Sequence, residues 1–172
     1  REVLLERPLG WAALGMARAL FALDQVDDAR TILEELLVAN PRLMAGYDLL
    51  ARCLEASNEP ELAKKVLEDA VAISPHVVRR LRKLGEVALA TGDAEGAEKS
   101  FKQVVSKARY SEFRDPEDHV NLVKALVTRG DVVQATGVIR DLERSLRGSP
   151  AADACKSYAT SLLHDKTGNG GA

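Results

Sequence analysis

Apolar residues recur at steps of three and four along most of the chain, the spacing that places them on one face of an α-helix. One stretch shows the whole pattern, with apolar or small residues at Val78, Leu81, Leu84, Gly85, Ala88 and Leu89. Gly92 then ends the predicted helix, because glycine adopts the left-handed backbone conformation without strain. Asp93 can cap a second helix, whose apolar stripe contains Ala97, Phe101 and Val104. The stretch therefore predicts a helix, a short turn and a second helix.

This helical pair recurs along the chain. Its central alanine occurs at Ala29, Ala63 and Ala97, where 63 − 29 = 34 and 97 − 63 = 34. A fourth copy is centred on Ala135, where 135 − 97 = 38, so four residues are inserted before it. A period of this length is the mark of a repeat array in which every unit is one supersecondary motif. We therefore predict four helical pairs and one terminal helix, about nine helices in all, and no strand.

The four inserted residues are expected within residues 109–114, between the third and fourth pairs. Insertions in repeat arrays map to loops, and long loops carry function more often than short ones. Tyr110 and Phe113 in this segment are therefore either exposed contact residues or aromatic residues packed beneath the loop.

The period and its motifs resemble the tetratricopeptide repeat family over nearly the whole chain. The family's central alanine falls on the four alanines above, its closing proline on Pro41 and Pro75, and its Leu-Gly pair on Leu84 and Gly85. The resemblance implies an all-α solenoid of helix–turn–helix repeats stacked in a right-handed superhelix. It also places His119 where the family has a packing aromatic residue, so we expect this histidine to be structural.

The alignment with the family divides the chain into segments. We expect residues 1–7 to be the tail of a preceding helix and residues 8–164 to be the repeat array. Within the array, units are expected at about 10–43, 44–77, 78–115 and 116–149, with a final helix at 150–164. Residues 165–172, which are rich in glycine, are expected to be a disordered tail.

The resemblance also implies where a partner binds, because the first helix of each repeat lines the concave face. The residues carried over to that face are Trp11, Arg18, Phe21, Asp48, Arg52, Glu55, Arg79, Arg82, Glu86 and Lys124. Their arginines form either a basic stripe for a peptide or a solvated face with local ion pairs. Trp11 and Phe21 are either anchors for a partner or packing residues for a preceding helix.

A narrower resemblance links two segments, residues 7–15 and 113–119, to the repeat region of bacterial response regulators. It implies an output or adaptor role in a two-component signalling protein of the cytoplasm. The phosphoacceptor receiver domain of those regulators is not part of this sequence, so none of its phosphoryl chemistry is expected here.

Charge and composition exclude several other functions. The formal net charge is −2, from 24 basic and 26 acidic residues, whereas nucleic-acid binders usually carry a basic excess. No stretch approaches the about 20 apolar residues that a membrane-spanning helix needs. Cys53 and Cys155 lie far apart in the chain, which predicts neither a disulfide nor a zinc site and fits a reducing cytoplasm. The three histidines fall in different units, so no metal site is expected.

The sequence carries no catalytic motif, and we expect neither enzymatic activity nor a cofactor. The acidic cluster at residues 115–118 is better explained as a helix start, in which Asp115 caps and Pro116 takes the first helical position. Two functions remain open: a module that binds a protein or peptide in its concave groove, and a homo-oligomerisation module that forms a dimer.

Overall fold

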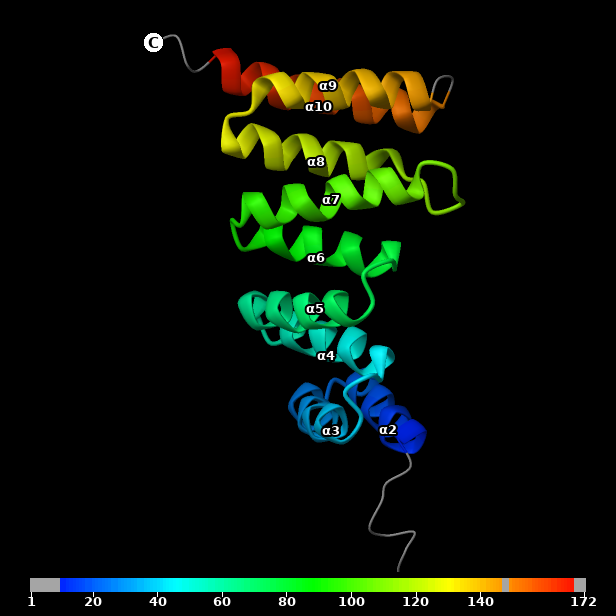
Figure 1. Cartoon of the computed structure of the whole chain (residues 1–172). Helices are drawn as coiled ribbons and strands as arrows, with labels where there is room; N and C mark the ends of the chain where they lie inside the picture. Colours follow the sequence, from blue (N-terminus) through cyan, green and yellow to red (C-terminus); the bar gives the residue numbers. More distant parts are fainter. Residues whose placement is uncertain (1–9, 147–148, 169–172) are drawn as a thin grey trace, which may run out of the picture. The chain divides into compact units, whose positions relative to one another are not determined.

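The computed structural model describes residues 10–146 and 149–168, and this part of the chain consists of nine α-helices without a strand (Figure 1). The all-α class predicted from the apolar spacing is confirmed. The predicted helix tail at residues 1–7 lies outside the described residues. The helices in chain order are α2 (Gly10–Ala22), α3 (Val26–Ala39), α4 (Met44–Ala56), α5 (Pro60–Ile73), α6 (Val78–Ala90), α7 (Ala94–Ala108), α8 (Pro116–Arg129), α9 (Val132–Ser145) and α10 (Pro150–Gly168).

The chain divides into two compact units between Pro75 and His76. In the first unit, α2 packs against α3 and α4, and α4 packs against α3 and α5. In the second unit, α8 lies between α7 and the pair formed by α9 and α10, and α6 packs mainly on α7. Every described helix except α5 therefore packs against at least two others, which a single helical pair does not provide.

The turn within each helical pair has the same backbone geometry. Asp24, Asn58, Gly92 and Gly130 have φ angles of 62°, 58°, 77° and 82°. Their spacings repeat those of the alanines, with 58 − 24 = 34, 92 − 58 = 34 and 130 − 92 = 38. The left-handed residue ends the first helix of the pair, and glycine, asparagine and aspartate are the residues that tolerate this conformation.

Small residues set how closely the paired helices approach. Ala29, Ala63, Ala97 and Ala135 each have 0% of their surface exposed. Gly85 on α6 faces the ring of Phe101 on α7, and a Cβ atom at this position would lie 2.7 Å from Phe101 Cε2. The Leu-Gly pair noted in the sequence therefore makes room for the largest apolar side chain of the second unit's core.

The terminal helix is longer than predicted. α10 continues to Gly168, beyond the expected end at residue 164, so residues 165–168 of the predicted disordered tail are helical. The sequence offers no glycine or proline between His164 and Gly168 to stop the helix. Near the end of α10, the Thr167 hydroxyl donates hydrogen bonds of 3.1 Å to the backbone carbonyls of Leu163 and His164.

His119 is a buried histidine of α8, as expected for a residue that replaces a packing aromatic. It is 4% exposed, and its Nε2 lies 3.8 Å from Asp141 Oδ2 on α9. Burial lowers the pKa of His119, although the nearby carboxylates of Asp141 and Asp118 act in the opposite direction. The imidazole is therefore held in its neutral form between the two helices.

The depressed pKa of His119 predicts that stability depends on pH. The ordinary pKa of histidine, about 6.5, applies to His119 in the unfolded chain. Below that pH, His119 binds a proton in the unfolded chain but not in the folded chain, so the free energy of unfolding falls as the pH falls. The loss is at most about 1.4 kcal/mol per pH unit for one proton. Urea unfolding at pH values between 7 and 5 measures this loss in the free energy of unfolding. His119→Phe should flatten the curve, and an equally steep curve for that variant would contradict this explanation.

Candidate functional site

A hollow of about 440 Å³ lies between the first helices of the two repeats in the first unit. Residues from α2 form one wall and residues from α4 the other. The lining consists of Arg18, Phe21, Ala22, Ala45, Asp48, Leu49 and Arg52. The resemblance to the repeat family had placed Arg18, Phe21, Asp48 and Arg52 on the concave face, and these four side chains line one cavity.

Arg52 and Phe21 form the most ordered part of this hollow. The Arg52 guanidinium carbon stands 4.7 Å from the centre of the Phe21 ring, a cation–π arrangement between α4 and α2. Stacking on the ring restricts the orientation of the guanidinium, whose planar fork matches the geometry of a carboxylate. The lining has a formal charge of +1, because it contains two arginines, Arg18 and Arg52, and one carboxylate, Asp48. The apolar side chain of Leu49 belongs to the same lining.

A second hollow, of about 330 Å³, occupies the corresponding place between α6 and α8 in the second unit. Its chemistry is different, because carboxylates outnumber cations. The lining consists of Arg82, Glu86, Leu89, Asp115, Glu117, Asp118 and Asn121.

The arginine of the second hollow is already engaged within the protein. Arg82 donates from Nε to Asp118 Oδ1 at 2.6 Å and from Nη2 to Asp118 Oδ2 at 2.8 Å. Its Nη2 also donates to the Phe113 carbonyl at 2.7 Å. The Asp118 side chain is 2% exposed, and this bidentate partner raises the pKa of Arg82 above its usual value. Arg82 is thus a structural arginine, unlike the open groove residue that its position on the helix predicts.

The other predicted groove residues have separate surroundings. Trp11 is 74% exposed and lines neither hollow. The Arg79 guanidinium stacks on the Phe113 ring at 5.4 Å, and the Lys124 ammonium lies 5.5 Å from the Tyr158 ring. Glu55 is half-buried outside the first hollow, whereas Glu86 lines the second.

Sequence reasoning missed Asp118 and Leu49. The only signal for Asp118 was a carboxylate on the apolar stripe of a helix, which requires a cation partner when buried.

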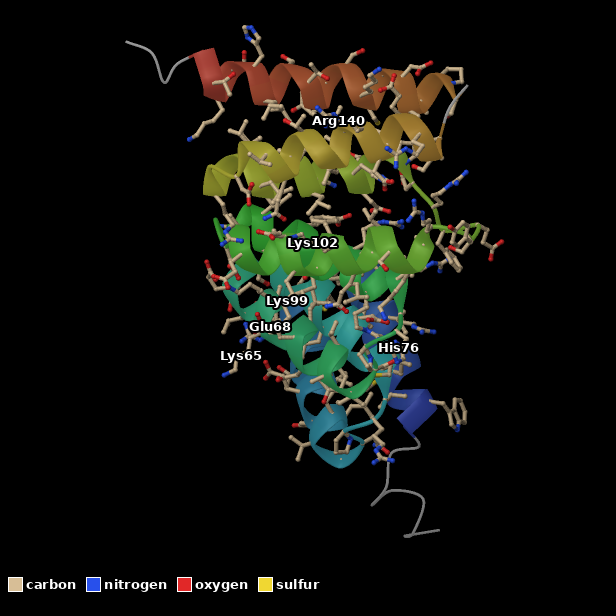
Figure 2. All side chains as sticks on the ribbon, turned by 45° about the horizontal axis from the view of Figure 1, so that its top comes forward. Lys65, Glu68, His76, Lys99, Lys102 and Arg140 are labelled. Atoms are coloured by element: carbon tan, nitrogen blue, oxygen red, sulfur yellow. The ribbon has the colours of Figure 1, made fainter. Side chains whose placement is uncertain are left out.

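A network of charged and polar side chains also links α7, α8 and α9 in the second unit. Glu98 on α7 is 7% exposed and accepts hydrogen bonds from Lys102, at 2.5 Å, and from Arg129 on α8. Lys102, labelled in Figure 2, also donates to the Gln134 side chain of α9 at 2.7 Å. Burial raises the pKa of Glu98, but its two cationic partners outweigh burial and hold the pKa below the usual value. These contacts satisfy a buried carboxylate and therefore explain it structurally.

The described residues contain no group of three metal-ligating side chains. Burial raises the pKa of both Cys53 and Cys155, which disfavours the reactive thiolate. None of the described helices combines the length and the apolar character needed to cross a membrane.

Comparison with known proteins identifies the repeats. Family models described as "Tetratricopeptide repeat" match residues 10–35 and 45–77, which cover α2 to α5. The two repeats of the first unit thus match the tetratricopeptide repeat family, and the solved structures below support the same family for the chain. No curated protein sequence matches it.

Solved structures show the same fold at low sequence identity. YrrB, described as a tetratricopeptide protein with an unusual peptide-binding site, is 12% identical, with 98% of this chain and 92% of that chain covered and a TM-score of 0.70. A tetratricopeptide protein of Parabacteroides merdae is 12% identical, with coverages of 93% and 60% and a TM-score of 0.72. The protein TTC0263 of Thermus thermophilus is 22% identical, with coverages of 94% and 86% and a TM-score of 0.56.

These findings establish an all-α repeat solenoid and the broad class of function. Tetratricopeptide arrays are protein–protein interaction modules, and they generally act as scaffolds. At these identities the structural neighbours inform the fold alone, so the partner has to be argued from this chain's own surface.

Because Arg82 is paired with the buried Asp118, we predict that removing Arg82 lowers the free energy of unfolding more than removing Arg18. Arg82→Ala leaves a carboxylate buried without its partner and should lower the free energy of unfolding by about 3–5 kcal/mol. Arg18→Ala, at an exposed position of α2, should change it by less than about 1 kcal/mol. Urea unfolding followed by circular dichroism compares the two variants. Replacing both Arg82 and Asp118 with leucine should recover part of the loss, and equal stability of the two alanine variants would refute the assignment.

Proposed function

We propose that the chain binds a protein or peptide partner in the concave groove of its repeats, without catalysing a reaction and without a metal or cofactor. The observation that carries the proposal is the hollow between α2 and α4. Its volume, about 440 Å³, falls in the range of small ligand sites. It combines an apolar base with a few oriented polar groups, the combination by which binding sites fix one ligand.

The lining favours a peptide that carries a carboxylate beside an apolar side chain. Arg52 is pre-oriented by Phe21 and can hold a carboxylate through two parallel hydrogen bonds. Arg18 adds a second cation to the same hollow, while Leu49, Ala22 and Ala45 accommodate apolar atoms. The carboxylate belongs either to an acidic side chain or to the end of the partner chain. The peptide-binding site named for YrrB supports the use of this fold for such a ligand.

We further propose that the module acts as the output or adaptor part of a bacterial two-component regulator in the cytoplasm. The support is the resemblance of residues 7–15 and 113–119 to the repeat region of those regulators. The remaining predicted groove residues, Arg79, Glu86 and Lys124, would then widen the contact beyond the first hollow. Glu55 and Trp11 would contribute at its margins.

Substitutions in the hollow test the groove assignment. The probes are fluorescent peptide libraries with random sequence, prepared with a free carboxyl end, with an amidated end, and with Asn and Gln in place of Asp and Glu. Arg52→Lys keeps the charge but loses the planar bidentate contact, so affinity for carboxylate peptides should fall about tenfold. Ala22→Leu fills the hollow and should weaken every peptide that enters it. Fluorescence polarisation measures both effects.

Lys65→Gln is the matched control, because Lys65 lies exposed on α5, outside the hollow (Figure 2). All three variants change exposed positions and should melt like the parent protein. Equal affinity for carboxylate and amide peptides would reject the ligand chemistry. Binding that Ala22→Leu leaves unchanged would reject the hollow as the site.

A second candidate function is homo-oligomerisation, favoured by an uncovered stripe on α2. Met16 is 55% exposed, and Ala12 and Ala19 on the same face are also exposed. Their counterparts 34 residues later on α4 are all buried, with Leu50 at 5% and Cys53 at 0%. On α4, Leu37 of α3 covers this stripe so closely that a Cβ on Gly46 would lie 2.9 Å from its side chain. A second copy could cover the α2 stripe through a symmetric contact.

Light scattering after size exclusion tests this second function. The wild-type chain should form a concentration-dependent dimer, and Met16→Glu should be monomeric because it places a charge in the contact. Val133→Glu on α9 is the control, since it adds the same charge at an apolar residue that is 83% exposed. A wild-type monomer at every concentration, or a Met16→Glu dimer, would eliminate the dimer interpretation.

A further inference from the structure

The loop between α7 and α8, residues 109–115, presents an aromatic side chain to solvent. Tyr110 is 94% exposed, more than any other large apolar or aromatic side chain in the described residues. Phe113, by contrast, is 38% exposed and lies under the Arg79 guanidinium. The two explanations that the sequence left open therefore apply to different residues. Phe113 is partly packed, whereas Tyr110 is exposed to solvent with the Arg109 guanidinium 5.8 Å from the centre of its ring. We call residues 109–115 the Tyr110 loop.

Hydrogen bonds on both sides of Tyr110 hold this loop in one conformation. The Ser111 hydroxyl donates to the Ala108 carbonyl at 3.1 Å and accepts from the Phe113 amide at 3.2 Å. Arg114 Nη1 donates to the Ser145 carbonyl at the end of α9 at 3.1 Å. Arg82 binds the Phe113 carbonyl from α6. The loop is thus anchored to α6, α7 and α9, and ordering it on binding costs little entropy.

The surroundings of the Tyr110 loop are cationic. Arg79 stacks on a ring, Arg114 binds backbone carbonyls, and Lys107 Nζ lies 3.0 Å from His76 Nδ1, so none of these contacts neutralises the positive charge. The nearby carboxylates are largely engaged: Asp141 pairs with Arg109 at 3.3 Å, and Asp115 caps the amino end of α8.

Glu112 is the exposed carboxylate within the Tyr110 loop. Arg79, Lys107, Arg109 and Arg114 give four positive charges, against three negative charges from Glu112, Asp115 and Asp141, so this region carries a net charge of +1.

We propose that the Tyr110 loop is a second interaction surface, separate from the groove, in which Tyr110 enters an apolar recess of an acidic protein segment. A rigid, exposed tyrosine supplies a large contact area at low entropic cost, which is why tyrosine is enriched among residues that dominate interfaces. The surrounding cations select a partner of opposite charge and speed its approach. With a net charge of −2 the chain lacks the basic excess that supplies most nucleic-acid affinity, which argues against a nucleic acid as this partner.

A phage-displayed library of random short peptides, selected on the full chain and depleted on Tyr110→Ala, provides the probe. Selected peptides should be rich in Asp and Glu with an apolar residue. Tyr110→Ala should weaken them by about thirtyfold or more, the hot-spot range, whereas Tyr110→Phe should retain most of the affinity. Raising the salt concentration should weaken binding, because exposed charges are screened over about 8 Å at physiological ionic strength.

Controls separate this surface from the groove and from other aromatic residues. Tyr158→Ala removes an exposed ring on α10, and Arg52→Lys alters the hollow of the first unit. Both should leave binding of the selected peptides unchanged, and all variants should keep the parent's melting curve.

Three results would each overturn the proposal. The depleted selection could yield no binder, the binders could be uncharged and insensitive to salt, or Tyr110-dependent binding could appear only with single-stranded RNA. Failure of this proposal leaves the groove proposal unaffected, because the groove tests use other peptides and no substitution at Tyr110.

Discussion

The close contact of paired helices at small residues is the constraint on which the rest of the structure depends. Each repeat has an alanine at this contact, and all four are fully buried. At this separation the side chains of a pair interdigitate, but they cover only one side of each apolar stripe. The other side must be covered by the next repeat, as α3 covers α4.

Much of the fold was predictable because this contact and the turns leave marks in the sequence. The alanine spacing located every helical pair, and Gly92 and Gly130 located two turns whose φ angles are 77° and 82°. Asp24 was not predicted as a turn, although its φ of 62° makes it equivalent to those glycines. Aspartate is common at many other positions, so only the three-dimensional register identifies it. The end of α10 was also missed: residues 164–168 are exposed, and the helix continues because neither glycine nor proline lies between His164 and Gly168 to stop it.

The candidate site was only partly predictable, because a helical period assigns a face and not a partner. Arg18 and Arg52 occupy the same position of adjacent repeats, since 52 − 18 = 34, and both line the first hollow. Arg82 stands 34 residues after Asp48, and its guanidinium is bound by Asp118 of α8. Periodicity carries no information about which of several carboxylates a fold will bury. A buried carboxylate on an apolar stripe was the one available clue.

The same ion pair connects the second hollow to the Tyr110 loop. Arg82 uses its guanidinium to neutralise Asp118 and to hold the Phe113 carbonyl, so it builds the loop with donors that a ligand would otherwise use. The second hollow is then left with Glu86 and Glu117 as its exposed charges, while the first keeps two arginines. The two hollows therefore differ in the charge of their linings: arginines outnumber the carboxylate in the first, and carboxylates outnumber the arginine in the second. Because complementary charge selects partners, the two linings favour ligands of opposite charge.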